Sequence, residues 1–152
     1  MIPLVFHPIY SQLDLPVRHR FPTEKYQGIR DALATKGVTD DSFFMPTPVS
    51  PKDLCKVFNP QYVQQLVTGN LDAKAMRRIG FPWSAQLIKR SLTAVGGTVL
   101  TAELALEHGK ALNLTGGYHH AFANYGSGFC LFNDLYLAAL NMLRSSKIDK
   151  VL

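Results

Sequence analysis

The sequence contains only two cysteines, Cys55 and Cys130, among 152 residues. Two thiols cannot form the disulfide framework of a small secreted domain. No apolar run approaches the roughly 18 residues that a membrane span needs. The first residues also lack the basic segment and the long apolar stretch of a secretory signal. We therefore expect a reducing, cytoplasmic location and no membrane partner.

Acidic residues are fewer than basic ones, with 11 Asp and Glu against 16 Lys and Arg, so the formal net charge is +5. A basic chain raises the hypothesis of nucleic-acid binding. The basic residues are scattered, however, and the densest groups are only Lys74/Arg77/Arg78 and Lys89/Arg90. A nucleic-acid surface concentrates its charge, so we expect no nucleic-acid partner. A second interpretation of the charge is that the chain is incomplete and its acidic complement lies elsewhere.

Hydrophobic residues make up 47% of the chain, which is enough for one domain with a sizeable core. Their spacing and the capping residues predict the elements in order. We expect strands at 2–6, 42–45 and 111–115, and the start of another at 150–152. We expect helices from an N-cap at Thr23 to about Ala34, over about two turns from Ser50, from Asn59 to Gly69, over 72–78, over 84–108 and over 131–144.

The second half of the chain therefore alternates helix and strand, which predicts an α/β fold with a parallel sheet. We expect the strand at 111–115 and the apolar helix at 131–144 to be buried. Gly96 and Gly97 interrupt the long helix, and close packing against a neighbouring strand would explain them. In such sheets the functional site lies beyond the carboxyl ends of the strands, which is where the Gly-rich segment 116–128 falls.

Two adjacent histidines, His119 and His120, stand in this Gly-rich segment. Imidazole transfers protons near neutral pH, so two rings turned toward one pocket could divide acid–base work. The residues alone leave other interpretations open. One histidine could be structural, or both could bind one zinc, although zinc ligands are usually spaced more widely. No acidic residue lies between Glu107 and Asp134, so no nearby carboxylate is expected to orient either ring.

Two further residues near the histidines have simple structural interpretations. Cys130 begins an apolar helix, where a buried thiol is more common than a nucleophile, but a Cys–His hydrolase stays open as an alternative. Asp134 lies early in the same helix, where its charge complements the macrodipole. Gly126–Gly128 lacks the further residues of a phosphate-binding loop.

Gly116–Ala121 (GGYHHA) and Gly128–Asp134 (GFCLFND) together resemble the active-site loop of the histone deacetylase, acetoin-utilisation and acetylpolyamine amidohydrolase superfamily. His19–Tyr26 resembles the N-terminal segment of bacterial members. Ile79–Ser84, with the helix that carries Gly96 and Gly97, is similar to their middle part. The resemblance covers essentially the whole chain.

The resemblance implies an arginase-like, deacetylase-type three-layer α/β fold with a parallel sheet, of which residues 1–152 would be the N-terminal portion of one domain. It implies a zinc-dependent amidohydrolase that removes acetyl groups from acetylated lysine or polyamines. By the same matching, His120 is the general base and His119 has an electrostatic or acid role. Gly128 and Phe129 match the wall of the substrate tunnel.

The zinc ligands of the family are an Asp-x-His pair after the next strand and a later Asp, and a Tyr polarises the acetyl carbonyl. None of these matches a residue up to Leu152, so we expect zinc in the complete domain but no ligand from this chain. The chain as given would then be catalytically incomplete. An alternative is a non-catalytic fragment or interaction module that needs a partner chain, in which the open sheet edge would favour self-association.

Overall fold

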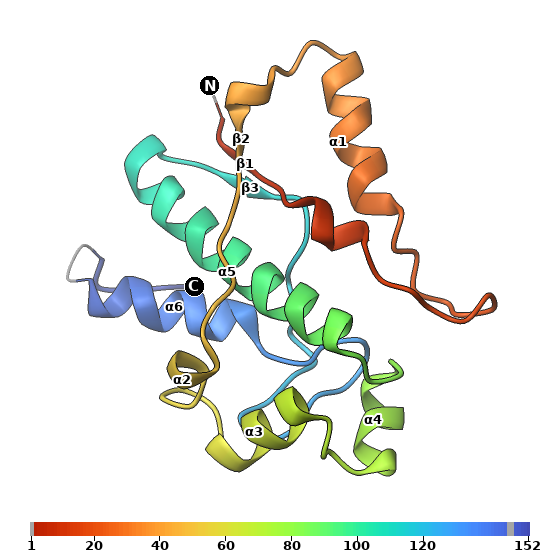
Figure 1. The fold of residues 1–152 in the computed structure, drawn as a ribbon. Coiled ribbons are helices and arrows are strands. Elements are labelled where there is room, and N and C mark those ends of the chain that lie inside the picture. The colour runs from red at the N-terminus through yellow and green to blue at the C-terminus, as the bar shows by residue number, and fades with distance from the viewer. Residues whose placement is uncertain (1, 146–147) are drawn as a thin grey trace.

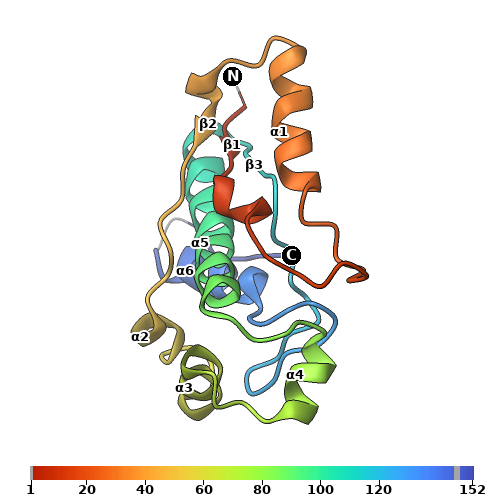
Figure 2. The ribbon, with the colours of Figure 1, turned by 45° about the vertical axis from the view of Figure 1, so that its right-hand side comes forward.

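The computed structural model describes residues 2–145 and 148–152, and its centre is a small parallel sheet. Strands β1 (Leu4–Val5), β2 (Phe43–Phe44) and β3 (Leu112–Asn113) pair in the order β2-β1-β3, with Leu4 opposite Phe43 on one side and Leu112 on the other. In Figure 2 the strands lie between α1 on one side and α5 on the other. The parallel α/β arrangement expected from the sequence is confirmed.

The helices follow the capping signals of the sequence closely (Figure 1). Ser50, Asn59, Asp72, Ser84 and Asn133 each accept a backbone N–H at a helix start, as N-caps do. The helices are η1 (Pro8–Ser11), α1 (Lys25–Thr35), η2 (Asp40–Ser42), α2 (Pro51–Leu54), α3 (Pro60–Thr68), α4 (Ala73–Ile79), α5 (Ala85–His108) and α6 (Asp134–Arg144). Within the described ranges, none is long and apolar enough to cross a membrane.

Two glycines let α5 approach the rest of the molecule very closely. A Cβ at Gly96 would lie 2.0 Å from the carbonyl oxygen of Thr47, in the segment after β2, and one at Gly97 would lie 2.2 Å from the Tyr10 hydroxyl. Neither position has room for a methyl group. The glycines therefore serve close packing. Gly97 packs against a strand as expected, since its Cβ would also lie 3.2 Å from the Asn113 side chain of β3, whereas Gly96 packs against the segment around Thr47.

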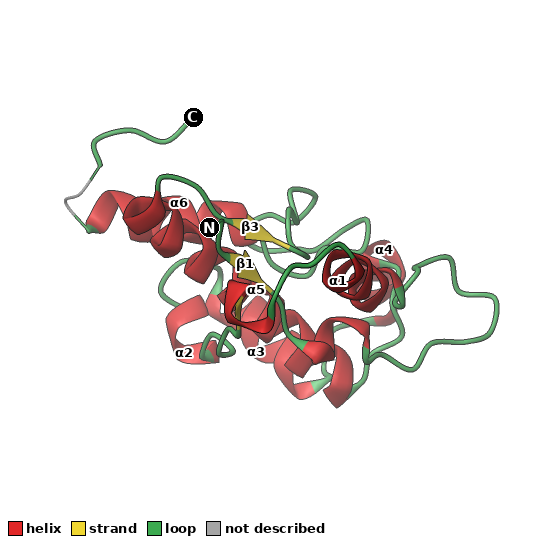
Figure 3. Ribbon diagram, turned by 90° about the horizontal axis from the view of Figure 1, so that it is seen from above, coloured by secondary structure: helices red, strands yellow, loops and turns green. Residues whose placement is uncertain are grey.

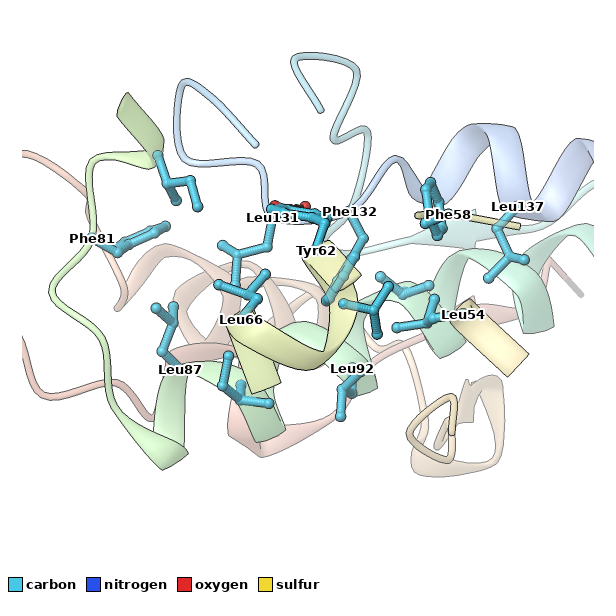
Figure 4. Close-up of a cluster of buried hydrophobic side chains, with 14 of the residues drawn as sticks. Leu54, Phe58, Tyr62, Leu66, Phe81, Leu87, Leu92, Leu131, Phe132 and Leu137 are labelled. Carbon is cyan, nitrogen blue, oxygen red and sulfur yellow. Dashed lines mark hydrogen bonds between the residues drawn. The ribbon is translucent and has the colours of Figure 1, made fainter. Parts of the chain in front are cut away.

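The larger hydrophobic cluster lies at the end of the molecule away from α1, where α2, α3 and α4 meet α5 and the start of α6 (Figures 1 and 4). Leu54, Leu66 and Phe132 are almost completely buried there. Burial of such side chains stabilises a fold by about 1.5–3 kcal/mol each. This cluster holds the end of the segment that carries the histidines, because Leu131 and Phe132 before α6 and Leu137 within α6 belong to it.

Several boundaries differ from the sequence expectations. Helix α1 starts at Lys25 with Glu24 as its N-cap residue, whose main-chain carbonyl accepts the Gly28 N–H, so Thr23 is not its N-cap. Helix α2 has four residues rather than about two turns. Helix α6 begins at Asp134 rather than near residue 131, because the Asn133 side chain caps it.

Two elements expected to be buried are partly exposed, and one expected strand is absent. Asn113 faces α5, so Leu112 and Leu114 face the opposite side of the sheet, and Leu112 at the sheet edge is 55% exposed. Helix α6 packs on α5 through one face and exposes Leu135 and Tyr136 on another. Lys150–Leu152 are described but exposed, and they form no strand because no neighbouring strand pairs with them. Figure 3 shows this end leading away from the helices.

Candidate active site

The candidate site is the loop that joins β3 to α6, residues 114–133 (Figure 1). It starts at the carboxyl end of β3, the position that the parallel-sheet pattern predicts for a functional site. Gly116 and Gly117 open the loop with φ angles of 101° and 78°. Only glycine adopts such backbone angles at little cost, so these two residues turn the chain sharply away from the sheet just before the histidines.

Asp134 holds this turn from the first turn of α6. Its Oδ1 accepts the Tyr118 N–H at 2.7 Å, and its Oδ2 accepts the Gly117 N–H at 3.0 Å and the Thr98 hydroxyl at 2.5 Å. The side chain is completely buried. The macrodipole interpretation of Asp134 is therefore incomplete, because the carboxylate ties the histidine loop to α5 and α6.

His119 and His120 lie side by side in the loop, with ring centroids 4.2 Å apart and ring planes inclined at 40°. The His119 ring Nδ1 is 2.9 Å from the Gly117 carbonyl oxygen, which can only accept, so Nδ1 carries the proton. In this tautomer Nε2 is the ring nitrogen that can accept a hydrogen bond. Both side chains are exposed, which leaves them accessible to a ligand.

Gly128 and Phe129 come next to His120 through a tight turn. Ser127 and Cys130 exchange two backbone hydrogen bonds, and both intervening residues have positive φ, 54° for Gly128 and 67° for Phe129. A Cβ at Gly128 would lie 3.4–3.5 Å from the His120 ring. A positive φ at a bulky residue costs of order 1 kcal/mol or more. The turn is held by the carbonyls of Arg78 and Ile79 at the end of α4, which accept the Gly128 and Phe129 N–H groups.

The Phe129 ring belongs to an aromatic cluster built from distant segments. Its centroid lies 5.7 Å from that of His19, 5.4 Å from Phe21 and 5.1 Å from Phe81. His19 is fixed in turn, since its Nδ1 accepts the Phe21 N–H and its Nε2 bonds the Gly80 carbonyl. We had noted His19, Phe21 and Phe81 only as parts of family-like segments, without a role. The only signal in the sequence was that His19–Tyr26 and Ile79–Ser84 both contain aromatic residues.

Cys130 is poorly suited to be a nucleophile. The thiol is buried, and burial raises its pKa, although a hydrogen bond from the His120 backbone N–H lowers it in part. A reactive cysteine needs a lowered pKa and access to substrate. Cys130 instead stabilises the turn, since its Sγ also bonds the Gly128 carbonyl at 3.5 Å.

The Tyr118 side chain, directly before the histidines, has polar and charged groups around it. Its hydroxyl lies 3.0 Å from the Thr115 hydroxyl, and burial raises its pKa while the cation of Arg90 opposes that rise. Arg90 is itself buried, donates to the Tyr10 carbonyl and lies 5.2 Å from the Phe21 ring centroid.

The donor chemistry of the described residues does not fit a zinc ion. Over residues 2–145 and 148–152, no group of three or more His, Cys, Asp or Glu side chains is arranged to hold a metal. Asp134, whose carboxylate bonds the loop directly before the histidines, already accepts three hydrogen bonds. No catalytic step through a metal can be derived from these side chains.

A family profile described as "Histone deacetylase domain" matches residues 19–152. An uncharacterised protein of Picosynechococcus sp. (strain ATCC 27264 / PCC 7002 / PR-6) is 45% identical over 151 residues, which are 99% of this chain and 50% of that protein. Acetoin utilization protein AcuC of Bacillus subtilis (strain 168) is 30% identical over 88% of this chain and 38% of its own length. Histone deacetylase 2 of Arabidopsis thaliana is 29% identical over 86% and 36%. The chain thus spans half or less of the length of these relatives.

Two solved structures have the same fold. The HDA15 HD domain matches with a TM-score of 0.73 and 18% identity, over 95% of this chain and 43% of that chain. An HDAC homolog complexed with SAHA matches with a TM-score of 0.72 and 21% identity, over 95% and 41%. The deacetylase-type α/β fold expected from the sequence is therefore confirmed.

Proposed function

Because this chain belongs to the histone deacetylase domain family, we propose that it carries the proton-transfer residues of a deacetylase. Residues 1–152 would be the N-terminal portion of a zinc-dependent amidohydrolase domain, and the zinc ligands would come from the remainder of that domain. The length of the relatives supports this proposal, since the chain covers 36–50% of each of the three. The substrate would be acetylated lysine or an acetylated polyamine.

The observation that carries the proposal is the adjacency of His119, His120 and Gly128 at the carboxyl end of β3. The two rings are 4.2 Å apart, and the Cβ position of Gly128 lies against His120. A pair of accessible imidazoles can accept and return a proton within one reaction. The fixed tautomer of His119, with Nδ1 bonded to the Gly117 carbonyl, supports a division of roles between the rings.

In the proposed reaction, His120 takes a proton from the attacking water. The water oxygen bonds to the acetyl carbonyl carbon, and the bond from that carbon to the amine nitrogen then breaks. The leaving nitrogen receives a proton from the histidine pair, so the products are acetate and a free amine. His119 stabilises developing charge, and Phe129 contacts the methylene chain that carries the acetylated nitrogen.

The experiment is an assay of the full-length protein that contains residues 1–152, in the presence of zinc, with acetyl-lysine peptides and acetylated polyamines. We expect release of acetate from one of these two classes and inhibition by SAHA, the compound bound to one of the similar structures. Turnover of neither class would contradict the deacetylase proposal and would favour the interaction module.

A prediction about metal follows from the donor set. The isolated 152-residue chain should not retain one zinc per molecule after dialysis, because two histidines without a carboxylate make a weak site. Metal analysis of the purified chain tests this. One tightly bound zinc per chain that is lost in both His119→Asn and His120→Asn would contradict it and would support the zinc-pair interpretation of the histidines.

Phe129→Ala in the full-length enzyme should raise KM about 5–10-fold and leave kcat nearly unchanged. Loss of a partly buried aromatic ring removes about 1 kcal/mol of apolar contact, and contacts made equally in the ground and transition states affect KM alone. Phe129→Leu is the matched control, because it retains apolar bulk at the same φ. A fall in kcat with an unchanged KM would exclude the tunnel-wall role.

A further inference from the structure

Asp134 is a buried carboxylate outside the set of residues that the proposed reaction uses. Its three donors come from two places in the chain: the adjacent loop amides of Gly117 and Tyr118, and the Thr98 hydroxyl on α5. The two loop amides belong to the residues directly before His119. Asp134 therefore restrains the backbone that leads into the histidine pair at two consecutive amides.

We propose that Asp134 is a positioning residue that holds His119 and His120 in the geometry needed for proton transfer. This inference rests on the proposed deacetylase function and deepens it. Gly116 and Gly117 have positive φ and no side chain, so the loop has little stiffness of its own at this point. Without the carboxylate, the two glycines would let the following histidines shift.

The loop backbone packs closely against the Asp134 carboxylate, which supports the positioning role. A Cβ at Gly116 would lie 2.8 Å from Asp134 Oδ2 and 2.6 Å from Thr98 Oγ1, so the loop backbone packs directly onto both groups. Thr98 Oγ1 also accepts the side-chain amide of Asn113 at 3.1 Å. A chain of hydrogen bonds therefore runs from β3 through α5 to α6 and ends at the loop.

The arrangement requires a carboxylate rather than an amide. Asparagine has one acceptor oxygen and one NH2 group, so either the Gly117 N–H or the Tyr118 N–H would face an N–H group after Asp134→Asn. That loop amide would lose its partner in a buried site, whichever way the side chain turned. Asp134→Asn therefore loosens the loop while it keeps nearly the same shape and volume.

The test compares Asp134→Asn with wild type in the full-length protein, and uses Asp14→Asn as a matched control at an exposed position. We expect kcat to fall about 10–100-fold, as misplacement of a catalytic group by about 1 Å does. KM should change by less than about twofold, because the residues proposed to contact substrate are untouched. A kcat within about twofold of wild type would overturn the proposal.

Amide hydrogen exchange provides a readout that does not depend on deacetylase activity. Exchange of the Gly117 and Tyr118 amides should accelerate in Asp134→Asn, while the amides in the middle of α5 keep their protection. Unchanged protection at Gly117 and Tyr118 would overturn the inference. If wild type turns over no acetylated substrate, the proposed function fails, and the exchange result alone decides the role of Asp134.

A second pair of variants covers the case in which Asp134→Asn does not fold. Thr98→Val removes the hydroxyl that donates to Asp134, and Thr98→Ser keeps it. We expect Thr98→Val to lower kcat and to accelerate exchange at Gly117 and Tyr118 more than Thr98→Ser does. Equal behaviour of the two variants in both measurements would contradict the positioning role.

Discussion

His120→Asn in the full-length enzyme is expected to lower kcat by about 10²–10⁴-fold, the usual contribution of a general base. Asparagine can form a hydrogen bond as one edge of imidazole does, but its amide does not take up a proton near neutral pH. The fold and the zinc content should be nearly unchanged, because the His120 side chain is exposed and is not a ligand in the proposed mechanism. Steady-state kinetics, thermal melting and metal analysis of the same preparation measure the three quantities.

His119→Asn should lower kcat less, since the base would still be present. His108→Asn is the matched control, because His108 is an exposed histidine at the end of α5, and its replacement should leave kcat unchanged. A His120→Asn enzyme that keeps full kcat would remove the general-base role from this residue. Loss of zinc in that variant would instead make His120 a ligand.

Gly96→Ala should destabilise the protein by about 2 kcal/mol, even though alanine favours helix by about 1 kcal/mol over glycine. The new Cβ would lie 2.0 Å from the Thr47 carbonyl oxygen, which is backbone and cannot move as a flexible side chain would. Overpacking of this kind typically costs about 1–3 kcal/mol, and a backbone contact falls at the upper end or beyond. The melting temperature should fall by about 4–8 °C.

Gly28→Ala is the matched control for this substitution. Gly28 lies inside α1, and a Cβ there would meet no atom within 4 Å, so only the helix preference remains. We expect Gly28→Ala to raise stability by about 0.5–1 kcal/mol. Equal melting temperatures for Gly96→Ala and wild type would show that α5 and the segment around Thr47 can separate without cost.

Helix boundaries were predicted well where a local signal determines them. Ser84 and Gly109 mark the two ends of α5, and Asn59 and Asp72 mark two further starts. Strand lengths were predicted poorly, since a strand is only as long as its partner allows. The five residues expected at 111–115 form a two-residue strand, and residues 150–152 form none.

The place of the histidine loop followed from the parallel-sheet pattern, because the carboxyl ends of such strands converge at one edge. The role of Asp134 did not follow. Its partners Thr98 and Gly117 are 36 and 17 residues away in sequence, and a carboxylate in the first turn of a helix already has a local explanation. An acid that begins a largely apolar helix was the only signal of burial, and it does not identify the donors.

The most direct test of the deacetylase proposal is to measure acetate and free amine together as the full-length protein acts on an acetyl-lysine peptide and on an acetylated polyamine. Wild type should release one acetate for each amine from at least one substrate. The double variant His119→Asn/His120→Asn should be reduced at least as strongly as His120→Asn alone. Equal turnover by wild type and the double variant, or none by wild type in the presence of zinc, would contradict the proposed function.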